Sequence, residues 1–129
     1  MSVKQLVILL LIVFAVVSCE NFYNDNDDYE EAIAMVESVR IDTVINLTAT
    51  ISLTCITPTP CWHFSRVVDQ RDSNQIYLTM YRKAKKYETC IQVISGFTHT
   101  MTLSVPTPGT YTLKIYRTPT STMDTTIVF

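Results

Sequence analysis

The chain has 129 residues, of which 47% are hydrophobic and 17% are charged. That length fits one domain, and that hydrophobic fraction argues against general disorder. The formal net charge of −2 at pH 7 provides no basic excess to attract a polyanion, so we expect no nucleic-acid partner.

Residues 1–18 are predicted to be a lipoprotein signal peptide. Lys4 precedes a twelve-residue apolar run from Leu6 to Val17. That run is too short to cross a bilayer as a helix and suits a signal peptide. It ends in Val16-Val17-Ser18-Cys19, which resembles the bacterial lipobox, where a small residue precedes the cut and a thiol follows it.

The lipobox resemblance implies that Cys19 carries acyl chains and fixes the protein to a membrane of the bacterial cell envelope. Glu20, rather than Asp, follows the cysteine, which favours the outer membrane or the cell surface over the inner membrane. An ordinary cleaved signal peptide and an uncleaved membrane helix are the alternatives.

Residues 19–36 are predicted to be a flexible acidic tether. Seven acidic and no basic residues lie between Glu20 and Glu37. A short helix over residues 29–36 is an option there, because acidic residues in its first turn would suit the helix dipole. From residue 38 onward nine basic and five acidic residues follow, so the folded domain is expected over residues 37–129.

That domain is predicted to be all-β. Alternating apolar and polar residues indicate short strands over residues 39–43, 49–55, 62–68, 75–81, 89–95, 98–105, 110–116 and 125–129. A polar hairpin loop is expected at 69–74, a basic connection at 82–86 and a tight turn at 106–109. Short strands at this spacing are typical of an antiparallel immunoglobulin-like β-sandwich.

The order Cys61, Phe64, Cys90, Phe97 and then Pro108-Gly109-Thr110-Tyr111 resembles a family of small exported bacterial domains of unknown function. The resemblance covers roughly residues 55–116. It implies an immunoglobulin-like sandwich and brings with it no known catalytic residue.

Three cysteines remain in the domain, and an oxidising compartment would allow one disulfide among them. Pairing of Cys61 with Cys90 is favoured, since it closes a loop of about 30 residues and stabilises by roughly 3–4 kcal/mol. Cys55 is then expected to be a buried thiol. Pairing of Cys55 with Cys61 across the proline-rich bend remains an alternative.

Three tyrosines are expected on the outward faces of two strands, close to a basic run. This candidate binding surface comprises Tyr77, Tyr81, Tyr116, Arg82, Lys83, Lys85 and Lys86. Aromatic and cationic side chains together suit contact with a protein or a glycan. The alternative is that the tyrosines form cross-strand pairs that only stabilise the sheet.

No motif in the sequence indicates catalysis. Cys61, His63 and His99 do not have the spacing of a metal site, and Met80 and Met101 add only soft donors. With two glycines in the chain, a glycine-rich phosphate loop is excluded. We therefore expect no metal, no cofactor and no enzyme activity, but a structural or interaction module, or an inhibitor-like binder using the 69–74 loop.

Overall fold

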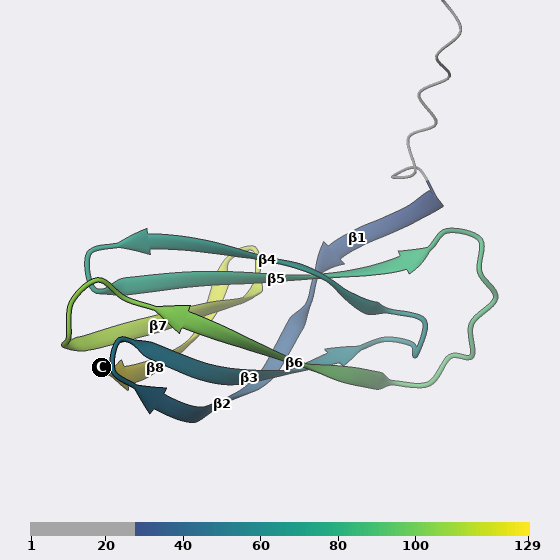
Figure 1. Cartoon of the computed structure of the whole chain (residues 1–129). Coiled ribbons are helices and arrows are strands. Elements are labelled where there is room, and N and C mark those ends of the chain that lie inside the picture. The colour runs from purple at the N-terminus through teal and green to yellow at the C-terminus, as the bar shows by residue number, and fades with distance from the viewer. Residues whose placement is uncertain (1–27) are drawn as a thin grey trace, which may run out of the picture.

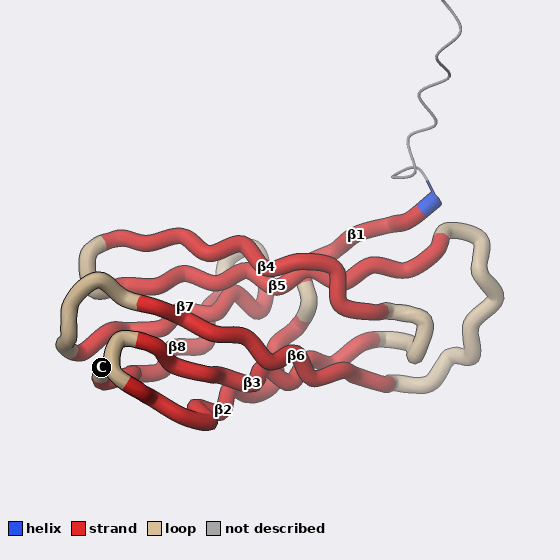
Figure 2. Tube along the Cα trace, in the orientation of Figure 1, coloured by secondary structure: helices blue, strands red, loops and turns tan. Residues whose placement is uncertain are grey.

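A computed structural model of the chain describes residues 28–129. The predicted signal peptide, the lipidation site at Cys19 and the first part of the tether lie outside this range. Within residues 28–129 eight strands form two sheets. Figures 1 and 2 show how the strands are arranged. They are β1 (Tyr29–Ile33), β2 (Met35–Ile45), β3 (Thr48–Thr57), β4 (His63–Asp72), β5 (Gln75–Lys85), β6 (Ser95–Ser104), β7 (Thr110–Thr118) and β8 (Ser121–Val128).

The larger sheet has five strands and the smaller has three. In the larger sheet the order is β1-β5-β7-β8, and β4 pairs with β5; the smaller sheet runs β2-β3-β6. The predicted β-sandwich is confirmed. One pairing differs from the antiparallel expectation: β5 and β7 are parallel, because the chain passes through β6 in the opposite sheet between them.

β1 corrects the prediction for residues 29–36. These residues form neither a tether nor a helix, because β1 pairs antiparallel with the end of β5, from Tyr29 opposite Lys85 to Ile33 opposite Tyr81. At Ala34 the chain leaves this sheet for the other. The Ala34 side chain is fully buried, and its N–H donates to the Met80 carbonyl at 2.8 Å. The folded domain therefore begins by residue 29 rather than at residue 37.

The core lies between the sheets and is built by strand alternation. Its fully buried members include alternate residues of three central strands, namely Ile51, Leu53, Ile76, Leu78, Met80, Leu113 and Ile115. These are inward positions that the period of two predicts. A polar contact also joins the two sheets at one edge. The Arg71 guanidinium in β4 donates hydrogen bonds to Asp69 in the same strand and to the Ser104 carbonyl in β6 of the other sheet.

Three connections differ from the sequence prediction. The polar loop at 69–74 shrinks to a two-residue turn, because β4 continues to Asp72. The basic connection at 82–86 is mostly strand, since β5 continues to Lys85. Residues 89–94 form a loop, not a strand: β3 ends at Thr57, just before Pro58, so no neighbouring backbone is left to pair with them.

Candidate interaction surface

The predicted tyrosines come together on the outer face of the five-stranded sheet. Tyr77 and Tyr81 flank Thr79 along β5, and Tyr116 of β7 lies directly opposite Thr79. The rings of Tyr77 and Tyr116 stack with centroids 6.3 Å apart and planes at 28°. All three tyrosines are half-buried, so each is partly accessible to solvent.

Arg66 of β4 belongs to the same face. Its guanidinium carbon lies 4.0 Å from the centroid of the Tyr81 ring, which is the geometry of a cation–π contact. A register shift between Phe64 and Arg66 marks a β-bulge, which leaves Ser65 unpaired and redirects the strand. We call Tyr77, Tyr81, Tyr116 and Arg66 the aromatic face.

Glu31 of β1 holds Arg66 in place. The Arg66 Nε and Nη2 atoms donate to the two carboxylate oxygens at 3.0 and 3.2 Å, and the Ser65 hydroxyl donates at 2.7 Å. Hydrogen bonds from Arg66 and then Ser65 lower the pKa of Glu31 below its usual value. The pair is solvent-exposed, so it contributes little to stability. Its main effect is to fix the position of the guanidinium over the Tyr81 ring.

A shallow depression of about 530 Å³ adjoins the aromatic face. It is lined by Tyr29, Glu31, Ser65, Arg66 and Lys83. The Lys83 ammonium lies 5.2 Å from the centroid of the Tyr29 ring. The depression therefore offers a carboxylate, a hydroxyl, two cations and an aromatic ring within one concave site.

The basic residues of the predicted surface do not all lie on the same face of the sheet. Lys83 and Lys85 lie on the outer positions of β5, beside the depression, and Lys86 is in the turn that follows. The assignment of Arg82 to this surface is wrong, because strand alternation places its side chain on the inner face of the sheet. Its guanidinium carbon lies 4.5 Å from the Trp62 ring centroid, and burial lowers its pKa.

Sequence reasoning missed Tyr29, Glu31, Ser65 and Arg66. The acidic composition around Tyr29 and Glu31 favours a tether or a helix, neither of which predicts pairing with β5. The position of Arg66 depends on the β-bulge, and no pattern in the sequence predicts that bulge. The alternation Tyr29, Glu31, Ile33 was the one available signal for a strand.

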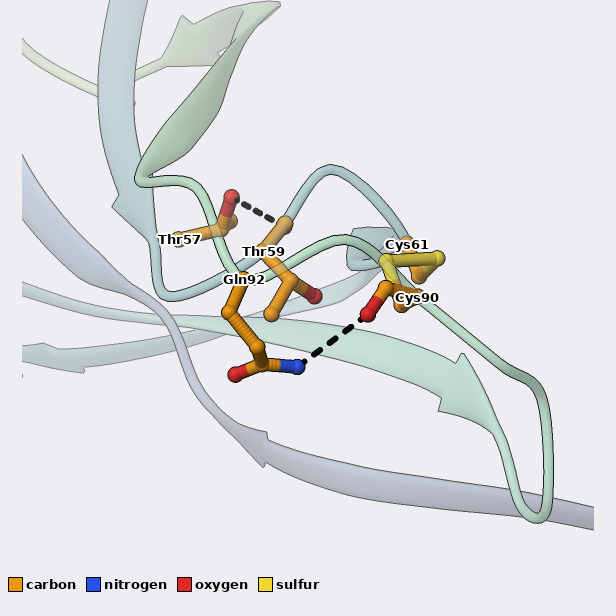
Figure 3. Close-up of a disulfide and its surroundings, with 5 residues drawn as sticks. All are labelled: Thr57, Thr59, Cys61, Cys90 and Gln92. Atoms are coloured by element: carbon orange, nitrogen blue, oxygen red, sulfur yellow. Dashed lines mark hydrogen bonds between the residues drawn. A yellow bond between two sulfur atoms is a disulfide. The ribbon is translucent and has the colours of Figure 1, made fainter.

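The disulfide joins Cys61 to Cys90, as predicted (Figure 3). It ties the bend after β3 to the loop before β6. Around it, the Thr57 hydroxyl donates to the Thr59 carbonyl at 2.8 Å, and the Gln92 amide donates to the Cys90 carbonyl at 3.2 Å. The half-cystines therefore serve as a structural link between two irregular segments.

Cys55 is a free and buried thiol, which agrees with its inward position in β3. Burial raises its pKa to about 11, so it is protonated at neutral pH. A protonated thiol is a poor nucleophile and a poor metal ligand. The structure gives it the role of a small core residue.

The histidines do not form a site. His99 stacks on Phe64 with centroids 3.8 Å apart, and burial lowers its pKa. His63 is exposed. Within residues 28–129 no group of three histidine, cysteine, aspartate or glutamate side chains is placed to hold a metal ion.

The fold and its surface define a class of protein: a disulfide-linked β-sandwich with an aromatic and cationic outer face. Within residues 28–129 no helix is long and apolar enough to cross a membrane. The family model of the ORF11 beta-sandwich domain matches residues 51–123, from β3 to β8. The chain therefore belongs to this family. No curated protein and no solved structure matches it.

Proposed function

We propose that the chain is a lipid-anchored protein of the bacterial cell envelope whose β-sandwich acts as a non-catalytic interaction module. The observation that carries this proposal is the sequence Val16-Val17-Ser18-Cys19 at the end of a short apolar run. A small residue before a cysteine at that point suits acylation of the thiol and cleavage of the bond before it. Stable anchoring needs more than one lipid chain, and a diacylated cysteine supplies two.

The disulfide supports export. Structural disulfides such as Cys61–Cys90 persist in oxidising compartments and are rare in reducing ones. An exported domain on a lipid anchor needs no membrane-spanning helix of its own. The outer membrane or the cell surface is the proposed location.

Metabolic labelling with an alkyne-bearing palmitate tests the anchor. We expect the wild-type protein to incorporate label and the Cys19→Ala variant to incorporate none. A Cys55→Ala variant is the matched control, because it also removes one thiol but leaves the proposed acylation site. Absence of label from the wild type, with the protein secreted in soluble form, would instead indicate an ordinary signal peptide.

A second candidate function is binding of a glycan or a protein at the aromatic face. Stacked tyrosines next to a fixed guanidinium combine a flat apolar surface with donors for hydrogen bonds, which suits sugar rings and peptide groups. Cross-strand pairing of Tyr77 with Tyr116 also stabilises the sheet by roughly 0.5–1.5 kcal/mol. The two roles are compatible, because stacking fixes the rings that a ligand would meet.

Site-specific photo-crosslinking tests this binding. A photoreactive residue at Gln70, opposite Tyr77 on the outer face, is expected to capture a partner in intact cells. Thr102, exposed on β6 in the opposite sheet, is the control position. Capture that persists after Tyr77→Ala and Tyr116→Ala substitution would exclude the aromatic face as the binding site.

A further inference from the structure

The loop between β5 and β6 exposes a cluster of large apolar side chains. The cluster comprises Tyr87, Ile91, Val93 and Ile94, and we call it the apolar tip. Ile91 is 68% exposed and Ile94 is 77% exposed. Single exposed apolar residues are common, but four within eight residues concentrate exposed apolar surface in one loop, which is typical of an interaction site.

The loop that carries this tip is anchored to the rest of the fold. The disulfide to Cys61 holds Cys90, and within the loop the Val93 N–H donates to the Ile91 carbonyl at 3.1 Å. The apolar surface continues into a groove of about 360 Å³, which is mostly apolar but includes a guanidinium; its lining residues are Met35, Ile56, Thr57, Pro58, Arg82 and Ile94. Met35 is itself 42% exposed. The tip is therefore part of a wider apolar end of the sandwich.

Cations border this apolar end. Lys85 and Lys86 are exposed and directly precede Tyr87. Glu88 is the single acidic residue between residues 85 and 94. Apolar side chains bordered by lysines match a bilayer interface, where the apolar groups enter the acyl boundary and the ammonium groups meet anionic headgroups.

The described chain begins at the same end of the molecule. The Asp28 carbonyl accepts a hydrogen bond from the Lys86 N–H at 2.8 Å, and Figure 1 shows the start of β1 beside the β5–β6 loop. Cys19 precedes Asp28 by nine residues. Nine residues span at most about 30 Å, so an acylated Cys19 keeps this end of the sandwich close to the bilayer.

We propose that the apolar tip docks onto the lipid bilayer that holds the anchor, with its apolar side chains in the interface and Lys85 and Lys86 at the headgroups. This inference rests on the proposed lipid anchor. Docking gives the sandwich a defined orientation: its disulfide end faces the membrane, and the β2–β3 turn points away. A bilayer is favoured over a protein partner because the chain length and the lysines both point to lipid.

Quenching by brominated lipids tests the docking. The full-length lipidated protein is placed in vesicles of phosphatidylethanolamine and phosphatidylglycerol with brominated acyl chains. Trp62 is the single tryptophan, so Trp62→Phe provides a silent background. Ile91→Trp then reports on the tip. Ile45→Trp, 67% exposed and next to the opposite turn, is the matched control for the 68% exposed Ile91.

We expect severalfold stronger quenching of the tryptophan at position 91 than at position 45. Replacing Lys85 and Lys86 by glutamine should reduce that quenching, and should have no effect in vesicles of phosphatidylcholine alone. Should the first tryptophan variant fail to fold, Ile94→Trp replaces it, because that side chain is also on the tip.

Flotation of the vesicles separates this inference from the proposed anchor. If the protein floats and positions 91 and 45 are quenched equally, the docking is refuted and the anchor stands. If the protein does not float, the anchor fails, and the docking that depends on it fails too. If the tryptophan at 91 is shielded from acrylamide in native membranes but is not quenched in vesicles, a protein partner covers the tip and the docking is wrong.

Discussion

Removing the Cys61–Cys90 disulfide should strongly destabilise the sandwich. The two half-cystines are separated by 29 residues, so the bond closes a loop of that length in the unfolded chain. On the chain-entropy model, opening a loop of about 30 residues lowers the free energy of unfolding by roughly 3.6 kcal/mol at 25 °C. For a domain of about 100 residues this corresponds to a fall in melting temperature of roughly 15 °C.

Thermal unfolding followed by circular dichroism measures this effect. A variant with Cys61→Ser and Cys90→Ser is compared with the wild type, with and without reductant. Reduction should bring the wild type down to the melting temperature of the double variant and leave the double variant unchanged. If the double variant melted within a few degrees of the oxidised wild type, the bend after β3 and the β5–β6 loop would be held by their other contacts. That result would refute an entropic stabilisation of this size by the disulfide.

Three further results are expected. Gly96→Ala should cost about 1–3 kcal/mol in urea unfolding, because a Cβ there would overlap the Cys55 carbonyl oxygen in the paired strand, whereas exposed Thr98→Ala should change little. The Cys55 thiol, with a pKa of about 11, should resist alkylation at pH 8 in the folded protein and react once urea unfolds it. The pKa of Glu31 is lowered in the folded state, so its contribution to stability is present above the unfolded pKa of about 4.3 and is lost as the pH falls through the folded pKa. The protection factors of the β1 amides, which correct for the slower intrinsic exchange in acid, should therefore fall as the pH is lowered, and Glu31→Gln should remove that dependence.

Strand alternation explains why most of the core was predictable. In residues 49–55 and 75–81 every second residue is apolar, and the buried set includes Ile51, Leu53, Ile76, Leu78 and Met80. A one-residue slip would expose the whole set, so the pattern itself specifies the inward face. The disulfide was predicted on a different ground: pairing Cys61 with Cys90 closes a loop of about 30 residues, and Cys55 is then left as a buried strand thiol, whereas the sequence left the Cys55–Cys61 pairing open.

Strand pairing was harder to predict, because it depends on which sheet edges the rest of the fold leaves unpaired. Residues 89–94 alternate well enough to suggest a strand, yet β3 ends before Pro58 and offers them no backbone. The segment from Tyr29 to Ile33 has a helical option by composition, yet the far end of β5 has an open edge that it fills. The local signal was ambiguous in both places, and a tertiary contact decided the outcome.

β1 connects the proposed anchor to the candidate binding surface. Its residues are the first described strand after Cys19, and its Glu31 positions the guanidinium that lies over Tyr81. Within residues 28–129, β1 pairs with β5 and with no other strand. β1 lies outside the residues that match the family model, and its Tyr29 and Glu31 complete the lining of the depression. Release of β1 from β5 would therefore dismantle the depression and free Arg66 without opening the core beneath. Under the proposed anchoring at Cys19, a pull from the anchor reaches β1 before any other described strand, so the proposed partner binding at the aromatic face should be sensitive to the orientation of the domain on the membrane.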